Sequence, residues 1–371
     1  MTPSEIRTTI VAHRNDRMGA RIISMLNAVR IARDYDRPYS VGWTTGGRTH
    51  EECRDPTYIF SQDYVDAHFF DTAELAEVHD DLIDLSTVGG TEAKFRTALA
   101  RGKTFMSGVM RGAIVLPWED EEAVTAALPG CLDAFDFSDP VRAMIAEIEE
   151  MFAGRTLTAF HVRRGDIIHD QIASNKLWPG KYIPREFYEL QLERLLEDDS
   201  VRVLVFSDTP EEVTRLKAMA PDRVLGIEDL FGQRDLTSGA RDFLELYAMS
   251  RCKRIFGPPS SAFSQTAATI GGGTVFDVQD SLSEDDQFAA LERMTDRLEQ
   301  RSPLFLNDGD VGQSLHFLAR HLLRKGEPDR AFRILQSYID DGFDKSFVFQ
   351  LYCEIAACNS CRAVSHAPSL R

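Results

Sequence analysis

The chain has 371 residues and carries 42 Lys and Arg against 59 Asp and Glu, which gives a formal net charge of -17. This acidic balance argues against a nucleic-acid binder, because such a protein needs a basic stripe to contact phosphates. It does not exclude a nucleotide, for which a local basic pocket is enough. No apolar run is long enough to predict a transmembrane helix, and we expect no secretory signal.

The six cysteines are scattered through the chain and do not form the pattern of a disulfide framework. We therefore expect a cytoplasmic, reducing location. Cys358 and Cys361, with Cys353 and His366, offer an alternative as zinc ligands. They lack a second paired knuckle, so free thiols are favoured.

The first half of the chain begins as a strand–helix–strand unit. The predicted elements are a strand over residues 7–13, a helix over 20–35, a strand over 39–44, short strands over 81–85 and 112–116, and helices over 91–101 and 139–151. Pro140 in the first turn supports the start of the last helix. Loops are expected around residues 46–51 and 71.

From residue 156 onward, short apolar strands alternate strictly with helices. The predicted strands cover 156–162, 201–206, 223–227, 254–257 and 275–278, and the helices cover 184–196, 211–218, 241–252 and 261–270. This alternation predicts a parallel, doubly wound sheet with right-handed crossovers.

The end of the chain is predicted to be helical. A charged amphipathic helix over 283–301 is followed by a linker over 302–310 and by helices over 313–324, 329–340 and 345–356. One stretch resembles a single tetratricopeptide-type hairpin, whereas such arrays need at least three copies. We therefore expect an accessory or oligomerisation cap, and domains over 1–150 (acceptor side), 151–301 (nucleotide sugar) and 302–371 (helical extension).

The central strand ends in the segment HVRRGD, residues 161–166. Because side chains alternate along a strand, His161 and Arg163 point to one face and Arg164 to the other. Ligands of open α/β sheets bind at this end of the strands, and a guanidinium fork suits a phosphate or diphosphate. The alternative is that the arginines are solvated and pair with Asp166 or Asp170.

Three further loops are predicted to converge on the same cleft. They are Arg17-Met18-Gly19, Ser207-Asp208 and Pro258-Pro259-Ser260-Ser261. Hydroxyls and free N–H groups at the start of a helix favour an anion, although simple N-capping by Ser260 or Ser261 is an equally good interpretation.

Together, HVRRGD, the Ser-Asp strand end and ELYAMSRCKRIFGPPSSAFS at 245–264 resemble the fucosyltransferase superfamily. This superfamily contains α1,2-, α1,6- (including rhizobial nodulation enzymes) and protein O-fucosyltransferases. The resemblance covers about residues 8–280. It implies an α/β, GT-B-like fold, with two Rossmann-like domains facing a cleft, plus the small C-terminal α-helical extension. The first loop departs from the glycine-rich form of the family.

The resemblance also implies roles for single residues. Arg163 would clamp the β-phosphate of GDP-fucose and stabilise the departing diphosphate, while His161 would contact the nucleoside. Glu245 would bind guanine N1 and N2, with Asp242 as its rival. The implied donor-binding set is Gly19, His161, Arg163, Arg164, Asp208, Glu245, Ser260 and Ser261. Ala262 stands where α1,6 enzymes have an amide.

The implied reaction is a single inverting displacement at the anomeric carbon, with no cofactor and no metal if Arg163 supplies the positive charge. The sequence leaves the general base open among Asp166, His169 and Asp170 or an acceptor-side residue. Arg163, Asp166 and Asp170 form the predicted catalytic set.

The sequence therefore predicts an inverting glycosyltransferase that moves fucose from GDP-fucose to a glycan or lipid-linked saccharide in polysaccharide biosynthesis. A membrane-associated acceptor lipid is one candidate partner, and a homo-oligomer or protein partner at the C-terminal helices is another. The alternatives are a non-catalytic nucleotide- or glycan-binding protein of the same fold and a scaffold for polysaccharide assembly.

Overall fold

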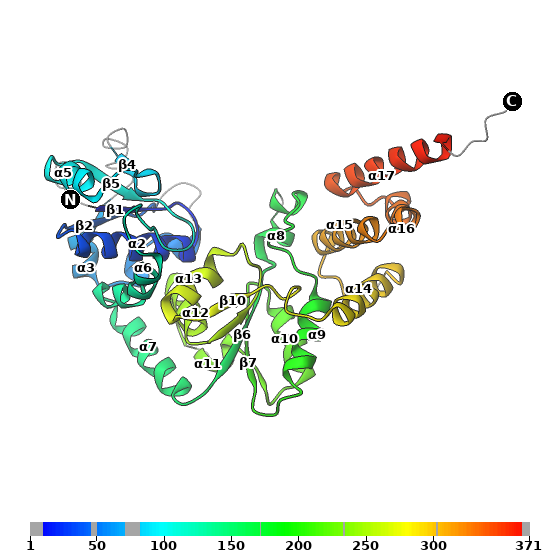
Figure 1. The fold of residues 1–371 in the computed structure, drawn as a ribbon. Coiled ribbons are helices and arrows are strands. Elements are labelled where there is room, and N and C mark those ends of the chain that lie inside the picture. Colours follow the sequence, from blue (N-terminus) through cyan, green and yellow to red (C-terminus); the bar gives the residue numbers. More distant parts are fainter. Residues whose placement is uncertain are drawn as a thin grey trace.

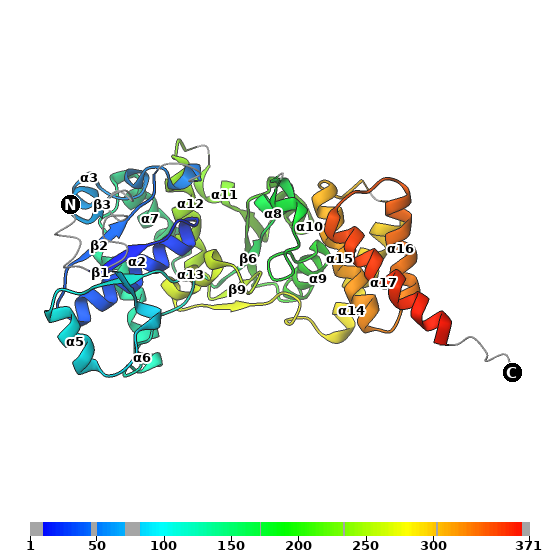
Figure 2. The same cartoon turned by 90° about the horizontal axis from the view of Figure 1, so that it is seen from above.

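The computed structural model describes residues 10–45, 50–70, 82–170, 172–232, 234–301 and 303–365, and for 358–365 it describes only the backbone. Three parts follow one another in space: an N-terminal lobe, a central sheet with its helices, and a group of C-terminal helices (Figures 1 and 2).

The N-terminal lobe is built on a five-stranded parallel sheet with the order β3-β2-β1-β5-β4. Its strands are β1 (Ile10–His13), β2 (Tyr39–Gly42), β3 (Phe69–Phe70), β4 (Leu82–Asp84) and β5 (Thr104–Ser107). The helices of the lobe are α2 (Met18–Asp34), α3 (Gln62–His68), α5 (Glu92–Ala100), α6 (Glu121–Ala127) and α7 (Asp139–Phe152), which leads into the central sheet. Residues 7–9, 46–49, 71 and 81 of the predicted elements lie outside the described residues.

The strand predicted over 112–116 is wrong, and the fifth strand is β5 instead. Side chains of α2 take the place of a neighbouring strand for this segment. The Ile114 N–H donates to Asn27 Oδ1 at 2.6 Å, and Arg30 Nη2 donates to the Ile114 carbonyl at 2.6 Å. Backbone polar groups need partners when they are buried, and here two polar residues of a buried helix supply them.

The central sheet is also five-stranded and parallel, with the order β10-β9-β6-β7-β8. Its strands are β6 (Leu157–Val162), β7 (Arg202–Ser207), β8 (Val224–Gly226), β9 (Arg254–Phe256) and β10 (Thr274–Phe276). Its helices are α8 (Gly165–His169), α9 (Arg185–Leu195), α10 (Pro210–Met219), α11 (Ile227–Phe231), α12 (Ser238–Ser250) and α13 (Ala262–Gly271). The predicted doubly wound sheet is confirmed, and α8 and α11 are additional to the prediction.

Short 3-10 turns lie in several of the connections between these elements. They are η1 (Glu51–Cys53), η2 (Pro56–Tyr58), η4 (Leu85–Thr87), η5 (Pro129–Ala134) and η6 (Ala173–Asn175).

The C-terminal helices are α14 (Glu284–Glu299), α15 (Asp308–Arg324), α16 (Pro328–Asp340) and α17 (Ser346–Ser365). The predicted linker ends earlier than expected, because Asn307 caps α15 by accepting from the Asp310 N–H at 3.0 Å. The helical extension and the two sheets facing one cleft confirm the predicted GT-B-like α/β architecture.

The two faces of β6 belong to different hydrophobic cores. Ala159 packs with the N-terminal lobe, α12 and α13, whereas Phe160 and Val162 pack with α9, α14 and the C-terminal helices. Leu318 of α15 and Leu335 of α16 lie in this second core. The C-terminal helices are therefore continuous with the central sheet.

Within the described ranges, no helix combines the length and apolar character needed to cross a membrane. The four described cysteines, Cys53, Cys131, Cys252 and Cys353, are free thiols. The zinc alternative at 358–366 lies outside the described side chains.

The core shared by the central sheet and the C-terminal helices predicts that these two parts unfold together in one cooperative transition. Leu318 is 1% exposed, so Leu318→Ala should lower the free energy of unfolding by about 2–5 kcal/mol in urea titrations. Phe349, which is 52% exposed, serves as the control, and Phe349→Ala should cost less than about 1 kcal/mol. A separate early transition that alone responds to Leu318→Ala would contradict the shared core.

Candidate functional site

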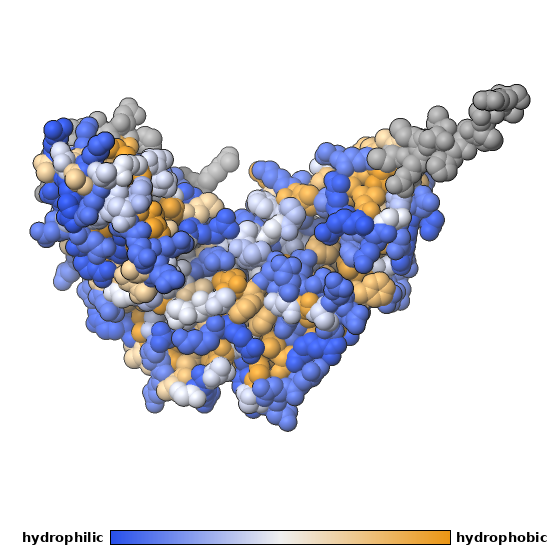
Figure 3. Space-filling model, viewed as in Figure 1, coloured by the Kyte–Doolittle hydropathy of each residue, from blue (hydrophilic) through white to orange (hydrophobic). Residues whose placement is uncertain are grey.

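A cavity of about 480 Å³ opens where the two sheets face each other. It lies beside the loops that follow β1, β6, β7 and β9 and beside the start of α13. Strand order reverses between β1 and β5 in one sheet and between β6 and β9 in the other, and such reversal points form ligand crevices. The molecule is hollowed between the N-terminal lobe and the projecting α8 region (Figure 3).

The four loops predicted to converge do meet at this cavity, hereafter the cleft. The predicted residues that line it are Gly19, His161, Arg163, Asp166, Asp208, Glu245, Ser260 and Ser261. Arg164 and Asp170 are not among the lining residues.

Arg163 is held at the wall of the cleft by two carboxylates. Its Nη1 lies 2.9 Å from Asp208 Oδ2, and its Nη2 lies 2.5 Å from Asp166 Oδ1. The other oxygen of Asp208 accepts from the N–H groups of Arg164 and Gly165 at 2.8 and 2.7 Å. A Cβ at Gly165 would overlap Asp208, so glycine is required for this turn. Asp208 thus fixes both the backbone turn and the guanidinium of Arg163.

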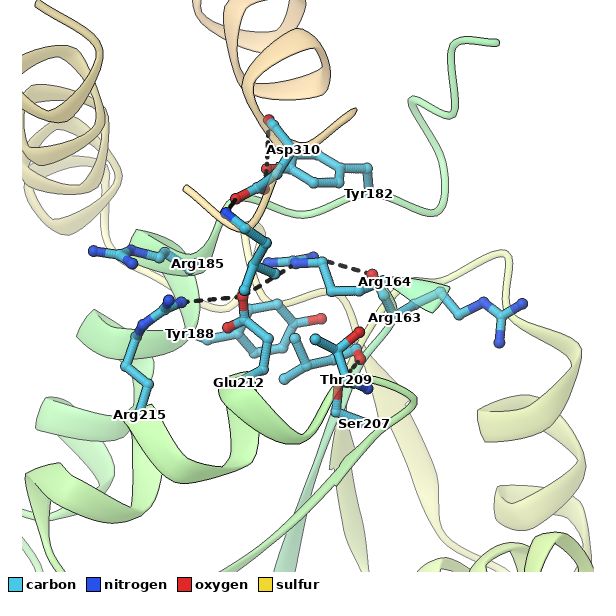
Figure 4. A network of polar contacts seen from close by, with 12 residues as sticks. Arg163, Arg164, Tyr182, Arg185, Tyr188, Ser207, Thr209, Glu212, Arg215 and Asp310 are labelled. Atoms are coloured by element: carbon cyan, nitrogen blue, oxygen red, sulfur yellow. Dashed lines mark hydrogen bonds and ion pairs between the residues drawn. The ribbon is translucent and has the colours of Figure 1, made fainter. Parts of the chain in front are cut away.

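Arg164 does not contact the cleft, which corrects its predicted role in donor binding. It is fully buried on the opposite face of the sheet, as the alternation of side chains requires. Its Nε lies 3.4 Å from Glu212 Oε1, and its guanidinium lies 4.7 Å from the centre of the Tyr182 ring. Figure 4 shows Arg163 pointing away from this buried group.

Asp170 also lies outside the cleft lining, and its predicted catalytic role is not supported. Its carboxylate accepts from the N–H groups of Ala173 and Ile172 at 2.7 and 2.8 Å, which lowers its pKa. His169 faces Asn307 and Thr209 instead of the cleft. Of the three candidate bases, only Asp166 lines the cleft.

His161 is neutral at the base of the cleft. It is 6% exposed and packs against the Phe263 ring at 5.5 Å. Burial, helped by the nearby Arg163 cation, lowers the pKa of its imidazole. Its Nδ1 is buried and has no hydrogen-bond partner among the described residues.

Gly19 lines the cleft and also allows two helices to pack closely. A Cβ at this position would lie 2.7 Å from Phe263 Cα, so glycine is needed for the close approach of α13. Thr266 Oγ1 also donates to the Gly19 carbonyl at 2.8 Å. The contact brings the N-termini of α2 and α13 together at the cleft, where both helix dipoles favour an anion.

Helix α12 contributes two carboxyl groups, Asp242 and Glu245, to the cleft lining. Burial, with the neighbouring Glu245 as a second cause, raises the pKa of Asp242 to about 8. Burial likewise raises the pKa of Glu245 to about 7, against the opposing effect of Arg241 at 3.1 Å. These groups change charge near neutral pH, as functional carboxyls often do.

The lining residues missed from the sequence include the side chain of Arg17, His50 and Lys181. Ser260 Oγ donates to the Gly180 carbonyl, which draws the loop carrying Lys181 to the cleft. Burial and the Arg17 cation lower the pKa of His50, so its imidazole is neutral at pH 7. His50 and Lys181 lie outside the four loops predicted to converge on the cleft, and the contact between Ser260 and Gly180 is what places Lys181.

Within the ranges that the structure describes, no group of three His, Cys, Asp or Glu side chains is arranged to hold a metal ion. The charged side chains that line the cleft are basic at Arg17, Arg163, Lys181 and Arg241 and acidic at Asp16, Asp166, Asp208, Asp242 and Glu245.

The solved structures that resemble this chain include fucosyltransferases. The NodZ alpha-1,6-fucosyltransferase soaked with GDP-fucose is 14% identical with a TM-score of 0.43, covering 71% of this chain and 92% of that chain. A variant of Arabidopsis thaliana FUT1 in complex with GDP is 13% identical with a TM-score of 0.45, covering 72% and 69%. POFUT1 in complex with GDP is 11% identical with a TM-score of 0.38, covering 72% and 96%. No protein-family model and no curated protein sequence matches the chain.

The raised pKa of Asp242 predicts a pH-dependent cost to folding. A carboxyl whose pKa is higher in the folded state stabilises the fold below its unfolded pKa, and this stability is lost as pH rises through about 8. Asp242→Asn should therefore raise the melting temperature more at pH 9 than at pH 5, because at pH 5 only part of the cost of keeping the folded-state carboxyl neutral has accumulated. Equal effects at both pH values would contradict the assignment.

Proposed function

We propose that this protein is an inverting glycosyltransferase that uses GDP-fucose. The observation that carries the proposal is the position of Arg163, at the wall of a cleft where two helix N-termini meet. A guanidinium and two helix dipoles together suit a diphosphate. The carboxyls of Asp242 and Glu245 lie in the same cleft and suit a base with two N–H donors.

In the proposed reaction, an acceptor oxygen bonds to the anomeric carbon of fucose while the bond from that carbon to the β-phosphate oxygen breaks. Negative charge then grows on the GDP that leaves. Arg163 stabilises this charge when it exchanges part of its contact with Asp166 and Asp208 for phosphate oxygens. Ser261 and the N–H groups of α13 bind the same diphosphate.

Guanine selection is proposed for Glu245. Guanine presents the N1 and N2 N–H donors to a carboxylate, whereas adenine presents an acceptor at N1. Binding therefore requires the charged form of Glu245, whose pKa is about 7. Asp242, with the higher pKa of about 8, is the less suitable partner at neutral pH.

The proton of the acceptor hydroxyl needs a base at the cleft. We assign this task to His50 or Asp166, because both line the cleft and the other predicted bases do not. His50 is neutral at pH 7, and Asp166 is already paired with Arg163. The acceptor is proposed to be a glycan or lipid-linked saccharide.

A nucleotide-binding protein without transfer activity is the second candidate. Ala262 at the start of α13 offers no side-chain amide to a phosphate. GDP binding without fucose transfer or donor hydrolysis across an acceptor panel would favour this candidate.

Arg163→Ala should reduce fucose transfer by about 100- to 1,000-fold, the usual effect of removing one donor to a developing negative charge. The rate of GDP release from GDP-fucose measures this loss. Arg251→Ala is the matched control, because Arg251 pairs with Glu149 away from the cleft lining. Full activity in a folded Arg163→Ala protein would contradict the proposal.

Glu245→Gln should weaken GDP binding by about 10- to 100-fold in calorimetric titrations, because it removes hydrogen bonds to a charged acceptor. Glu228→Gln is the control, since Glu228 also pairs with Arg241 but lies outside the cleft lining.

Wild-type affinity for GDP should also fall as the pH is lowered from 8 to 6, because Glu245 becomes protonated near pH 7. This dependence should be absent in Glu245→Gln. An unchanged pH profile in that variant would assign the titration to another group.

A further inference from the structure

The second arginine of HVRRGD connects the cleft to the C-terminal helices. Arg164 Nη1 donates to the Arg163 carbonyl at 3.0 Å, so the buried guanidinium holds the backbone of the residue that carries the cleft guanidinium. Its other contacts are with Glu212 of α10 and the ring of Tyr182. Burial alone lowers the pKa of Arg164, but Glu212 and other neighbouring groups more than offset this effect, so the side chain stays charged.

Tyr182 continues the connection into α15. Its hydroxyl donates to Asp310 Oδ1 at 2.5 Å and bonds with Ser314 Oγ at 2.8 Å. Asp310 is 2% exposed, and its Oδ2 accepts from the Leu306 N–H at 3.2 Å. Figure 4 shows the Tyr182 ring between Asp310 of α15 and Arg164.

A second contact joins α15 to the same motif through α8. A Cβ at Gly309 would lie 2.5 Å from the Ile168 carbonyl oxygen, so the first turn of α15 lies directly on α8. Asn307 Nδ2 lies 3.1 Å from His169 Nδ1 at the end of α8. The start of α8 carries Asp166, which pairs with Arg163 in the cleft.

We infer that the first turns of α15, residues 307–314, position Arg163 and Asp166 for donor binding. They do so through Tyr182 and Arg164 on one side and through α8 on the other. Gly309, Asp310 and Tyr182 are thus positioning residues of the cleft, although the cleft lining contains none of them. The inference rests on the proposed function only where it concerns the donor. It makes the C-terminal extension a structural support of the cleft.

Two glycines of α15 provide a matched test. Gly309→Ala places a methyl group against the backbone of α8, whereas Gly312→Ala places one against the movable side chains of Phe347, Lys345 and Phe343 at 3.1–3.4 Å. Both substitutions replace a glycine of α15 by a better helix former. Hydrogen exchange of the full-length protein should be several-fold faster at the amides of 165–169 in Gly309→Ala, with no change in Gly312→Ala.

The same pair should differ in GDP binding. Gly309→Ala should weaken GDP by about tenfold, and in an Arg163→Ala background it should have no further effect, because its influence passes through Arg163. Gly312→Ala should bind like the wild type. Tyr182→Phe should weaken GDP binding in the same way. Tyr338→Phe, which removes a buried hydroxyl of α16, should leave GDP binding unchanged.

Unchanged exchange over 165–169 in Gly309→Ala overturns the inference, and so does faster exchange with unchanged GDP affinity. A loss of GDP affinity in Gly309→Ala that adds to the loss in Arg163→Ala also overturns the inference, because the substitution would then act on binding by a route that does not involve Arg163. If the wild-type protein binds no GDP, the proposed function fails, and the exchange measurement alone still decides whether α15 positions α8.

Discussion

Alternation of side chains at the end of β6 is the constraint on which the cleft depends. Two adjacent arginines must point to opposite faces of the sheet, so Arg163 enters the cleft while Arg164 enters the core behind it. A buried guanidinium is stable only with partners, and Glu212 and the face of Tyr182 supply them. The fold therefore needs a polar region directly behind the site, and the C-terminal helices complete it.

The second constraint is the contact between α2 of the N-terminal lobe and α13 of the central sheet. Gly19 lets the start of α2 approach the start of α13, so that two helix N-termini share one cavity. Each sheet contributes its own reversal point, and the cleft lies between them. The anion binding that we propose for this cleft would thus depend on backbone geometry, to which Arg163 adds a fixed charge.

Much of this organisation could be predicted from the sequence, because it depends on local patterns. The strand–helix alternation after residue 156 was enough to predict the central parallel sheet. The alternation of side chains along a strand was enough to predict that Arg163 and Arg164 lie on opposite faces. The first lobe was harder, since the segment at Ile114 obtains its hydrogen bonds from side chains of α2. The approach of Gly309 to α8 could not be predicted, because it joins segments about 140 residues apart through their surfaces.

The central claim is that the cleft binds a guanine nucleotide sugar, and a thermal-shift panel tests it most directly. GDP, GDP-fucose, GDP-mannose, UDP and ADP would be compared at equal concentration with the wild-type protein. A ligand present at a hundredfold over its dissociation constant adds about 2.7 kcal/mol of stability, which is several degrees in melting temperature. The account predicts shifts with the guanine nucleotides alone. Equal shifts with UDP or ADP, or no shift with GDP, would contradict it.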